Sequence, residues 1–507
     1  MITAHNLLPP VRPSGNSSLN AEKRTHLTIL HINDLHGEVT EHAPAEEGKV
    51  GGIARIAGGI KELRSGNSEG TIVLDGGDFF EGSFYSKFSQ GEIVGKSYEK
   101  IGFDAIALGN HDVTWGLGPG SAVMRGAGAA ILSANMKPPV KESPAVDLIR
   151  PYTVIERKGL KIGILGLTCR EAETATPGRG EIAFDDPVAA ARNFVGELKG
   201  ETDLMVVLSH LGYSDDVKLA KSVEGIDVIV GSHSHTALKE GEMVGSTLVT
   251  QAGEYGDYIG KIDLVIDGAE KTIVSHQASL VPVTENIPAD NEVASIVASY
   301  LPKLDGIKDR VVGYAAEELE NFRHGEGGAN TNLTNLFIDS QRRDSDIALS
   351  STFSLRKGIP RGPITFGDLY EAHPFKRSLL QVRAQGSQVL EFLEEGLMDK
   401  NRVNGKIFSG LTYEYCREKP EGSRIVSLSF RGRQYSHEEF SGLSLTVSMD
   451  AYIKEKKCFR DCRVTKSYGD VFEIFKGEIE TLGTLRNLPS EVRYARVSDD
   501  APSTAAA

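Results

Sequence analysis

Five short apolar runs in this chain each lead directly into polar residues whose side chains can bind a metal ion. Runs of this length and composition predict buried strands. In a mostly parallel sheet, such strands deliver the residues that follow them to one edge, where binding sites are built. The fold must therefore bring five strand ends together. The runs are 27–31 before Asp34 and His36, 72–74 before Asp75 and Asp78, 105–108 before Asn110 and His111, 204–208 before His210, and 226–230 before His233 and His235.

These strand ends supply seven side chains of the metal-binding type. Residues two apart at a strand end point to the same side, so Asp34 and His36 can reach one ion. The carboxylate of Asp78 has two oxygens and can bridge two ions. One His or Asp in such a place is usually an ordinary histidine or a turn residue, but seven ligands together are about right for two metals. The predicted ligands are Asp34, His36, Asp78, Asn110, His210, His233 and His235.

Two divalent ions held ~3.5–4 Å apart would activate a water molecule for attack on phosphorus. They would share that water and lower its pKa, so that a bridging hydroxide becomes the nucleophile. His111, beside Asn110, is placed to contact the phosphoryl or leaving oxygen, and we predict His111 and Asp112 as the catalytic residues. Mixed nitrogen and oxygen ligands suit Mn, Zn, Fe or Co, and the sequence does not choose among these four metals.

Composition narrows the class of protein. Apolar residues make up 40% of the 507 residues and charged residues 25%, as in soluble globular proteins. The net charge of −14 disfavours a nucleic-acid binder, but bound metals would still attract a small anionic substrate. No apolar stretch approaches the ~20 residues that span a membrane, and no signal peptide is seen, so we expect a cytoplasmic protein without a membrane partner. The oligomeric state stays open, and the four cysteines favour reduced thiols over a disulfide scaffold.

The pattern of strands and helices predicts two domains. Helices are expected at 51–64, 186–198, 293–304, 331–343 and 388–397, and further strands at 247–250, 259–266 and 346–350. Segment 468–482 is compatible with either a helix or a pair of strands. The predicted organisation is a disordered leader at 1–25, an α/β domain at 26–285, a linker helix at 286–310, a second domain at 311–495 and a tail at 496–507.

The motifs around the predicted ligands resemble those of the calcineurin-like metallophosphatases, and more narrowly those of the 5′-nucleotidase family. Their order and spacing match along the whole first domain. The matching stretches are INDLHG at 32–37, GGIAR at 51–55, DGGD at 75–78, ALGNHD at 107–112, LSH at 208–210 and GSHSH at 231–235. The resemblance implies a four-layer αββα domain followed by an α+β C-terminal domain of the 5′-nucleotidase type.

The resemblance also implies a role for each ligand. Its assignment is Asp34, His36 and His235 to one metal, Asn110, His210 and His233 to the other, Asp78 as the bridge, and His111 as the transition-state contact. In the second domain, where the resemblance is less close, Arg356 matches a phosphate-binding arginine and Phe375 matches an aromatic residue that stacks on the base. Tyr452 falls at the second stacking aromatic position, and Arg323 matches another substrate-contacting arginine.

Three departures from the family pattern bear on the substrate and the mechanism. Thr114 stands where an Asp usually orients the catalytic His. Residues 456–459 replace a Gly-Gly-Asp-Gly loop, and Lys376 and Arg377 replace a residue that often contacts the base region. The catalytic machinery is therefore almost whole, while the part that reads the base is altered.

The favoured function is two-metal hydrolysis of a phosphoester, with a nucleotide as the predicted substrate. One alternative is hydrolysis of another anionic ester, such as a nucleotide sugar, a cyclic nucleotide or a thiosulfate ester. A second alternative is a binding or regulatory protein that has kept the fold and lost turnover. The complete ligand set argues against this last class, and Thr114 is the one feature in its favour.

Overall fold

The computed structural model of the chain describes residues 24–42, 49–137, 146–175, 182–321, 331–375, 377–397, 405–488 and 492–497. The predicted leader and tail lie almost entirely outside these residues. The chain divides into two compact units, with the boundary after Leu304 inside helix α8 (Asn291–Lys308). No helix in the described ranges is long and apolar enough to cross a membrane.

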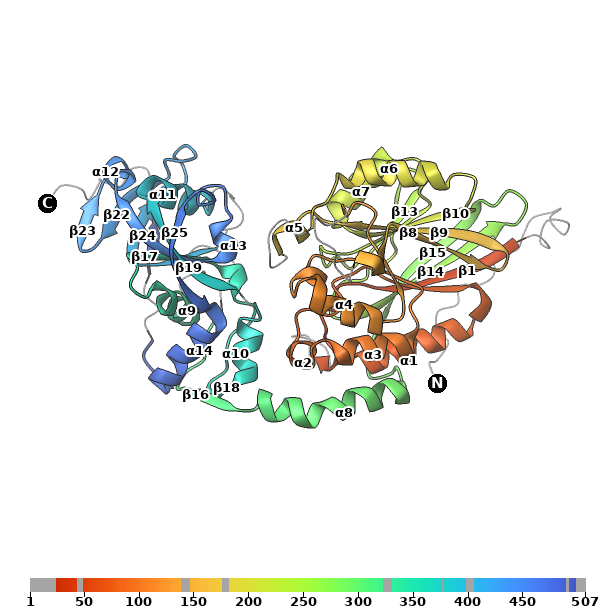
Figure 1. The fold of residues 1–507 in the computed structure, drawn as a ribbon, viewed down its shortest axis with the longest axis horizontal. Helices are drawn as coiled ribbons and strands as arrows, with labels where there is room; N and C mark the ends of the chain where they lie inside the picture. Colours follow the sequence, from red (N-terminus) through yellow and green to blue (C-terminus); the bar gives the residue numbers. More distant parts are fainter. Residues whose placement is uncertain are drawn as a thin grey trace. The chain divides into compact units, whose positions relative to one another are not determined.

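Two sheets packed face to face form the centre of the first unit (Figure 1). Their strands are β1 (Arg24–Ile32), β4 (Thr71–Asp75), β5 (Ala105–Ala107), β6 (Ala130–Leu132), β7 (Ile149–Arg150), β8 (Tyr152–Arg157), β9 (Leu160–Thr168), β10 (Leu204–His210), β11 (Val228–Gly231), β12 (Glu242–Val244), β13 (Thr247–Thr250), β14 (Tyr258–Asp267) and β15 (Ile273–Pro282). The orders are β15-β14-β1-β4-β5-β6-β7 and β12-β13-β11-β10-β9-β8. A short pair, β2 (Glu41–His42) and β3 (Val50–Gly51), lies apart from them.

The strands that matter for the site run parallel. Within the first sheet, β1, β4 and β5 are parallel neighbours, and within the second sheet β9, β10 and β11 are. The five predicted apolar runs therefore belong to two sheets. Their ends still meet, because alternate aliphatic residues of both sheets, such as Ile29 and Val206, interlock in one buried core. Burying each such side chain contributes about 1.5–3 kcal/mol, so the core fixes the strand ends firmly.

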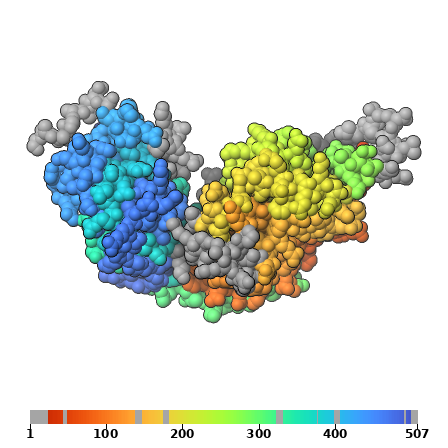
Figure 2. Space-filling view, turned by 45° about the horizontal axis from the view of Figure 1, so that its top comes forward, coloured from red at the N-terminus to blue at the C-terminus, as the bar shows by residue number. Residues whose placement is uncertain are grey.

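Helices cover the outer faces of both sheets. They are α1 (Ile53–Ser65), α2 (Phe84–Phe88), α3 (Glu92–Ile101), α4 (Leu117–Gly126), α5 (Ala172–Ala175), α6 (Pro187–Leu198) and α7 (Tyr213–Ser222). Helices α6 and α7 pack on the second sheet through residues such as Val195 and Leu219, and their segment, in yellow, forms an outer surface of this unit in Figure 2. Helix α1 packs against β1 and β14 of the first sheet. The layers are therefore α, β, β and α, as the resemblance implied.

The second unit is an α+β domain built on a five-stranded sheet of order β20-β17-β24-β19-β25. Smaller sheets have the orders β23-β22-β21-β27 and β18-β16-β26. The strands are β16 (Val311–Ala315), β17 (Ile347–Ser351), β18 (Gly362–Thr365), β19 (Ser378–Gln385), β20 (Lys406–Ser409), β21 (Leu411–Tyr415), β22 (Ile425–Phe430), β23 (Arg433–Tyr435), β24 (Ser444–Asp450), β25 (Arg463–Asp470), β26 (Thr484–Leu485) and β27 (Tyr494–Arg496). The helices are α9 (Asn332–Arg342), α10 (Phe366–Ala372), α11 (Gly386–Glu395), α12 (His437–Ser441), α13 (Ala451–Lys454) and α14 (Val471–Leu482).

The predicted elements are found with small shifts at their ends. The helix predicted at 186–198 is α6, and the side chain of Asp186 caps it by accepting a hydrogen bond from the Ala189 N–H at 2.8 Å. The helix predicted at 51–64 begins only at Ile53, because Gly51 and Gly52 have positive φ angles of 74° and 88°. The ambiguous segment 468–482 is the end of β25 followed by α14.

Candidate metal centre

The loops that follow β1, β4, β5 and β11, together with the last residue of β10, bring the seven predicted ligands together. The first two loops are joined by hydrogen bonds from Asp34 N–H to the Gly77 carbonyl at 3.0 Å and from His36 N–H to the Asp78 carbonyl at 2.8 Å. Non-glycine residues rarely adopt a positive φ, and those that do gather at functional sites. Five of the seven predicted ligands have one: Asp34 (50°), His36 (51°), Asp78 (54°), His233 (69°) and His235 (55°).

The first cluster consists of Asp34, His36 and His235, whose ligand atoms all lie within 4.8 Å of one another. The Nε2 atoms of His36 and His235 face each other at 3.2 Å. Asp34 Oδ1 lies 3.7 Å from His235 Nε2. The Nδ1 atom of His36 donates to the Glu81 carbonyl at 3.0 Å, and Nδ1 of His235 is paired with the Glu254 carboxylate.

These contacts leave electron pairs that face each other. Each Nδ1 has an oxygen acceptor beside it and carries the ring proton, so Nε2 of His36 and Nε2 of His235 each present a lone pair. Two lone pairs at this distance repel unless a proton or a cation lies between them. Two imidazoles oriented by oxygen partners and one carboxylate are a donor set that suits a divalent transition metal.

The second cluster is centred on the buried imidazole of His210. Its Nε2 atom lies 3.1 Å from Asp78 Oδ2 and 3.1 Å from Asn110 Oδ1. Its Nδ1 atom lies 2.9 Å from the Gly76 carbonyl. The His233 ring is next to it, with ring centroids 5.1 Å apart. A nitrogen between two oxygen acceptors needs a cation or a proton there, so this donor set also fits a divalent cation.

The carboxylate of Asp78 lies between the two clusters and is fully buried. Its Oδ2 atom is 3.1 Å from His210 Nε2 and 4.0 Å from His36 Nε2. Its Oδ1 atom accepts a hydrogen bond from the His111 N–H at 2.7 Å. One oxygen of Asp78 therefore faces imidazoles of both clusters, as a bridging ligand requires.

The protonation of the site reflects this crowding. Burial lowers the pKa of His36 to about 3 and that of His233 to about 4. Burial also acts to lower the pKa of His210, but the Asp78 carboxylate raises it to about 10. Although burial opposes this, the imidazoles of His210 and His111 hold the pKa of Asp78 well below its usual range. A proton on His210 thus stands where a cation would otherwise neutralise Asp78, and metal binding would release it.

Two glycines allow the loops to come this close. Gly77 has a φ of 95°, which favours glycine. At Gly109 a Cβ atom would lie only 2.0 Å from Asp78 Oδ1. The glycine at position 109 is therefore required by the close approach of the neighbouring loop.

His111 lies beside the first cluster, edge-on to His36 with ring centroids 5.0 Å apart. The hydroxyl of Thr114 donates to the backbone carbonyl of His111 at 2.8 Å. The carboxylate at the imidazole is that of Glu81, whose Oε2 atom lies 2.7 Å from His111 Nδ1. We did not predict Glu81 as a site residue. Its one signal in the sequence is its position three residues after Asp78 in the same loop.

The carboxylate of Asp112, predicted as catalytic, is buried and turned toward the backbone. It accepts hydrogen bonds from the N–H groups of Asp78 and Gly109, both at 2.9 Å, and of Phe79 at 3.0 Å. Burial raises its pKa to about 7. These contacts join the loop that carries Asp78 to the loop that carries Asn110.

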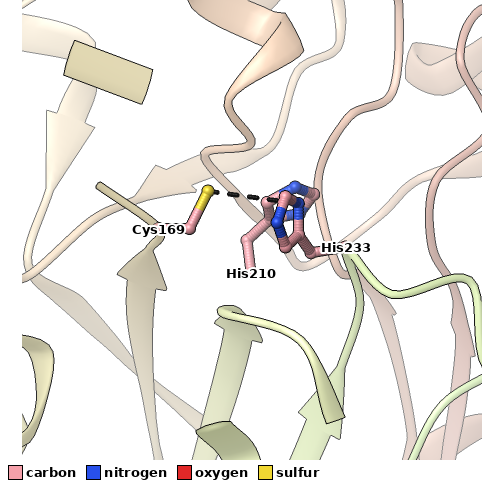
Figure 3. Close-up of side chains that lie close together, drawn as sticks. All are labelled: Cys169, His210 and His233. Carbon is pink, nitrogen blue, oxygen red and sulfur yellow. Dashed lines mark hydrogen bonds between the residues drawn. The ribbon is translucent and has the colours of Figure 1, made fainter. Parts of the chain in front are cut away.

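A further side chain at the second cluster, Cys169, was predicted only as a reduced thiol. Figure 3 shows its sulfur directed toward the rings of His210 and His233. Its Sγ atom lies 3.5 Å from Asn110 Oδ1 and 4.0 Å from His233 Nδ1. Burial raises the pKa of this thiol above its usual range. All four cysteines lie in the described ranges, and none of them is in a disulfide.

The predicted substrate-binding residues lie in the second unit. The Arg377 guanidinium carbon lies 4.3 Å from the centre of the Phe375 ring and 4.8 Å from that of Tyr452. Arg356 is also near, with its guanidinium carbon 5.0 Å from the Phe375 ring centre. The two predicted stacking aromatics therefore share one cation, and Arg323 lies outside the described residues.

Comparison with known proteins places the chain in a family. Residues 27–237 match the calcineurin-like phosphoesterases, and residues 311–448 match the C-terminal domain of 5′-nucleotidases. The chain belongs to the 5′-nucleotidase family of calcineurin-like phosphoesterases. This family consists of metal-dependent phosphohydrolases, so the predicted family, fold and enzyme class are confirmed.

Individual relatives of the 5′-nucleotidase family cover both units. The trifunctional nucleotide phosphoesterase protein YfkN of Bacillus subtilis is 29% identical over 449 residues, which are 79% of this chain and 30% of that protein. A snake venom 5′-nucleotidase of Gloydius brevicauda is 27% identical over 450 residues, 80% of this chain and 76% of that one. The crystal structure of a 5′-nucleotidase precursor from Thermus thermophilus is 26% identical, with a TM-score of 0.78, and covers 94% of this chain and 100% of its own.

Proposed function

We propose that the first unit binds two divalent metal ions and hydrolyses a phosphoester, most readily a nucleotide. The observation that carries this proposal is the buried Asp78 carboxylate, one oxygen of which faces His36 in one cluster and His210 in the other. When bound, such ions activate a shared water and neutralise charge on the phosphoryl group. In this proposal Asp34, His36 and His235 hold one ion, Asn110, His210 and His233 hold the other, and Asp78 bridges them.

The remaining side chains prepare the site for the substrate. His111 contacts a phosphoryl or leaving-group oxygen, because its ring lies beside the first cluster while its Nδ1 is held by Glu81. Asp112 has a positioning role, since its carboxylate is used on three backbone N–H groups. In the second unit, Arg356, Phe375 and Tyr452 are proposed to bind the substrate, and the resemblance supports the same role for Arg323.

A second candidate substrate class is favoured by the position of Arg377. A base stacked on an aromatic ring is worth about 1–3 kcal/mol, but here the guanidinium of Arg377 already lies over Phe375 and Tyr452. With Arg356 close by, the same residues would pair well with a second anionic group. Esters that carry such a group, including nucleotide sugars and cyclic nucleotides, are therefore the second candidates.

The test is turnover of a phosphoester panel by metal-free protein to which Mn²⁺, Zn²⁺, Fe²⁺ or Co²⁺ is added back. The panel contains nucleoside monophosphates, a nucleotide sugar, a cyclic nucleotide and an aryl phosphate. The proposal expects metal-dependent release of phosphate, with nucleoside monophosphates giving the highest kcat/KM. Hydrolysis of none of these esters with any metal would contradict it.

A further inference from the structure

The sulfur of Cys169 extends the second cluster beyond the seven predicted ligands. Resting on the proposed function, we propose that the Cys169 thiolate is a further ligand of the ion held by Asn110, His210 and His233. The ligand atoms of Cys169, His210 and His233 all lie within 4.8 Å of one another. As the metal–sulfur bond forms, the thiol proton passes to solvent, as in other thiolate sites.

The distances at Cys169 agree with those between ligands of a single ion. Zinc–sulfur and zinc–nitrogen bonds of about 2.3 and 2.0–2.1 Å at a tetrahedral angle put the two ligand atoms ~3.6 Å apart. The sulfur lies 3.5 Å from Asn110 Oδ1 and 4.0 Å from His233 Nδ1. The thiol therefore needs little movement to share an ion with them.

The backbone holds Cys169 in this position. It directly follows β9, whose last residue, Thr168, pairs in register with His210 of β10. The Cys169 N–H also donates to the His210 carbonyl at 3.0 Å. Sulfur and imidazole thus come from the paired ends of two parallel strands, and the side chain is 5% exposed.

A sulfur ligand would give the two metal positions different preferences for metal ions. The first cluster offers only carboxylate oxygen and imidazole nitrogen, from Asp34, His36 and His235. Thiolates select zinc, cobalt and similar ions over Mg²⁺ and Mn²⁺. The second position is therefore expected to prefer a softer ion than the first.

The test is the absorption spectrum of the full chain loaded with Co²⁺. Thiolate ligation gives an intense near-ultraviolet charge-transfer band that imidazole and carboxylate ligands do not give. Wild-type protein is expected to show the band, and Cys169→Ser and Cys169→Ala are expected to lose it. Zn²⁺ affinity of Cys169→Ser should fall by about 10–100-fold, and its Mn²⁺ affinity should change less.

The control is Cys416→Ala, which removes a second buried thiol, in the second unit, and should keep the band. A double variant, Cys458→Ser with Cys462→Ser, should also keep it. Wild-type protein that binds two Co²⁺ by elemental analysis without the band would overturn the thiolate ligand and leave the proposed function standing. Protein that binds no Co²⁺ would overturn the proposed function itself. The wild-type spectrum alone tests whether a thiolate is a ligand, even if the Cys169 variants do not fold.

A separate observation concerns the carboxylate that holds His111. We infer that Glu81 is the positioning residue for His111, in the role that the family pattern gives to the residue at position 114. Its Oε2 atom lies 2.7 Å from His111 Nδ1, and its carboxylate is largely buried. Its backbone carbonyl also accepts the Nδ1 proton of His36 at 3.0 Å. One residue thus orients two imidazoles of the site.

The test is the kinetics of Glu81→Gln and of the double variant Glu81→Gln with Thr114→Asp. Glu81→Gln should lower kcat by about 10²-fold or more, with KM and the number of bound metals unchanged. The double variant should recover much of that loss, because a carboxylate returns to His111 from position 114. A wild-type kcat in Glu81→Gln, or no recovery in the double variant, would overturn the assignment. Inactive wild-type protein would instead count against the proposed function.

Discussion

At the scale of single residues, Asp78 is the side chain on which both clusters depend. Its carboxylate faces His36 and His210, and the imidazoles hold its pKa well below its usual range. Asp78→Asn keeps the shape of the side chain but removes its charge. Both metals should bind more weakly, by more than the roughly 10–100-fold typical of a lost supporting group, and turnover should be abolished. Elemental analysis together with circular dichroism checks this, and a folded variant with two metals and normal activity would contradict it.

His111 is expected to behave differently from the ligands. His111→Ala should keep both metals, because His111 is not one of the seven proposed ligands, while kcat falls by about 10²–10⁴-fold. His26, an exposed histidine of β1 in the first unit, offers a matched control, since His26→Ala removes the same group away from the site. Metal loss from His111→Ala, measured by elemental analysis, would show that His111 is a ligand instead.

Much of the site could be predicted from the sequence, because most of the ligands are recognised by the residues just before them. Asp34, His36, Asp78, Asn110 and His210 stand immediately after apolar runs, so one rule about strand ends finds them. Glu81 could not be found that way, and Cys169 follows a strand, β9, that was not among the five predicted runs. Glu81 meets His111 across 30 positions of sequence, and Cys169 is a site residue only because β9 lies beside β10.

At the scale of elements, one buried carboxyl group connects β10 to α7. Asp216 of α7 accepts a hydrogen bond from the Ser209 hydroxyl and is fully buried. Burial raises its pKa to about 8. In the unfolded chain the carboxyl group of Asp216 has its usual pKa of 3.8. Between this pH and about 8, only the folded protein keeps the carboxyl group protonated. Its contribution to stability is therefore full at low pH and is lost as the pH rises toward 8, by about 1.4 kcal/mol for each pH unit.

Asp216→Asn should remove this loss, because the amide is neutral at every pH. The free energy of unfolding of the variant, relative to wild type, should rise steadily between about pH 5 and 8. Urea unfolding at several pH values checks this through the fluorescence of Trp115, the one tryptophan of the chain, which lies in the first unit. The exposed neighbour Asp215 gives the control Asp215→Asn. If the free energy of unfolding varied with pH in the same way for Asp216→Asn and wild type, the raised pKa would be contradicted.

The elements themselves were predictable because their signals are strong and local. The cap and proline at 186–187 define the start of α6, and the apolar run at 247–250 is β13. The division of five similar runs between two sheets was not readable from periodicity, since a strand buried on both faces gives the same pattern in either sheet. For that division, the family resemblance was needed.

At the scale of the whole molecule, we propose that the substrate range depends on the second unit, for which the sequence was least informative. Phe375→Ala should raise KM for nucleotides by about 10-fold, the loss of a stacked base, and leave KM for a small aryl phosphate unchanged. Arg377→Ala is the matching variant, because it removes the guanidinium that lies over both rings and should lower KM for nucleotides. Steady-state kinetics on both substrates checks the pair. Equal effects on both substrates would show that these aromatics serve only the packing of the unit.

We propose that the hydrolysis depends on two metal ions bound to the first unit. The most direct measurement is to strip the protein with a chelator, add metal back in steps, and follow bound metal and phosphate release in the same samples. We expect no turnover without metal and full turnover only when two ions are bound per chain, and Asp78→Asn should not recover activity. Full turnover by metal-free protein, or by protein with a single bound ion, would contradict it.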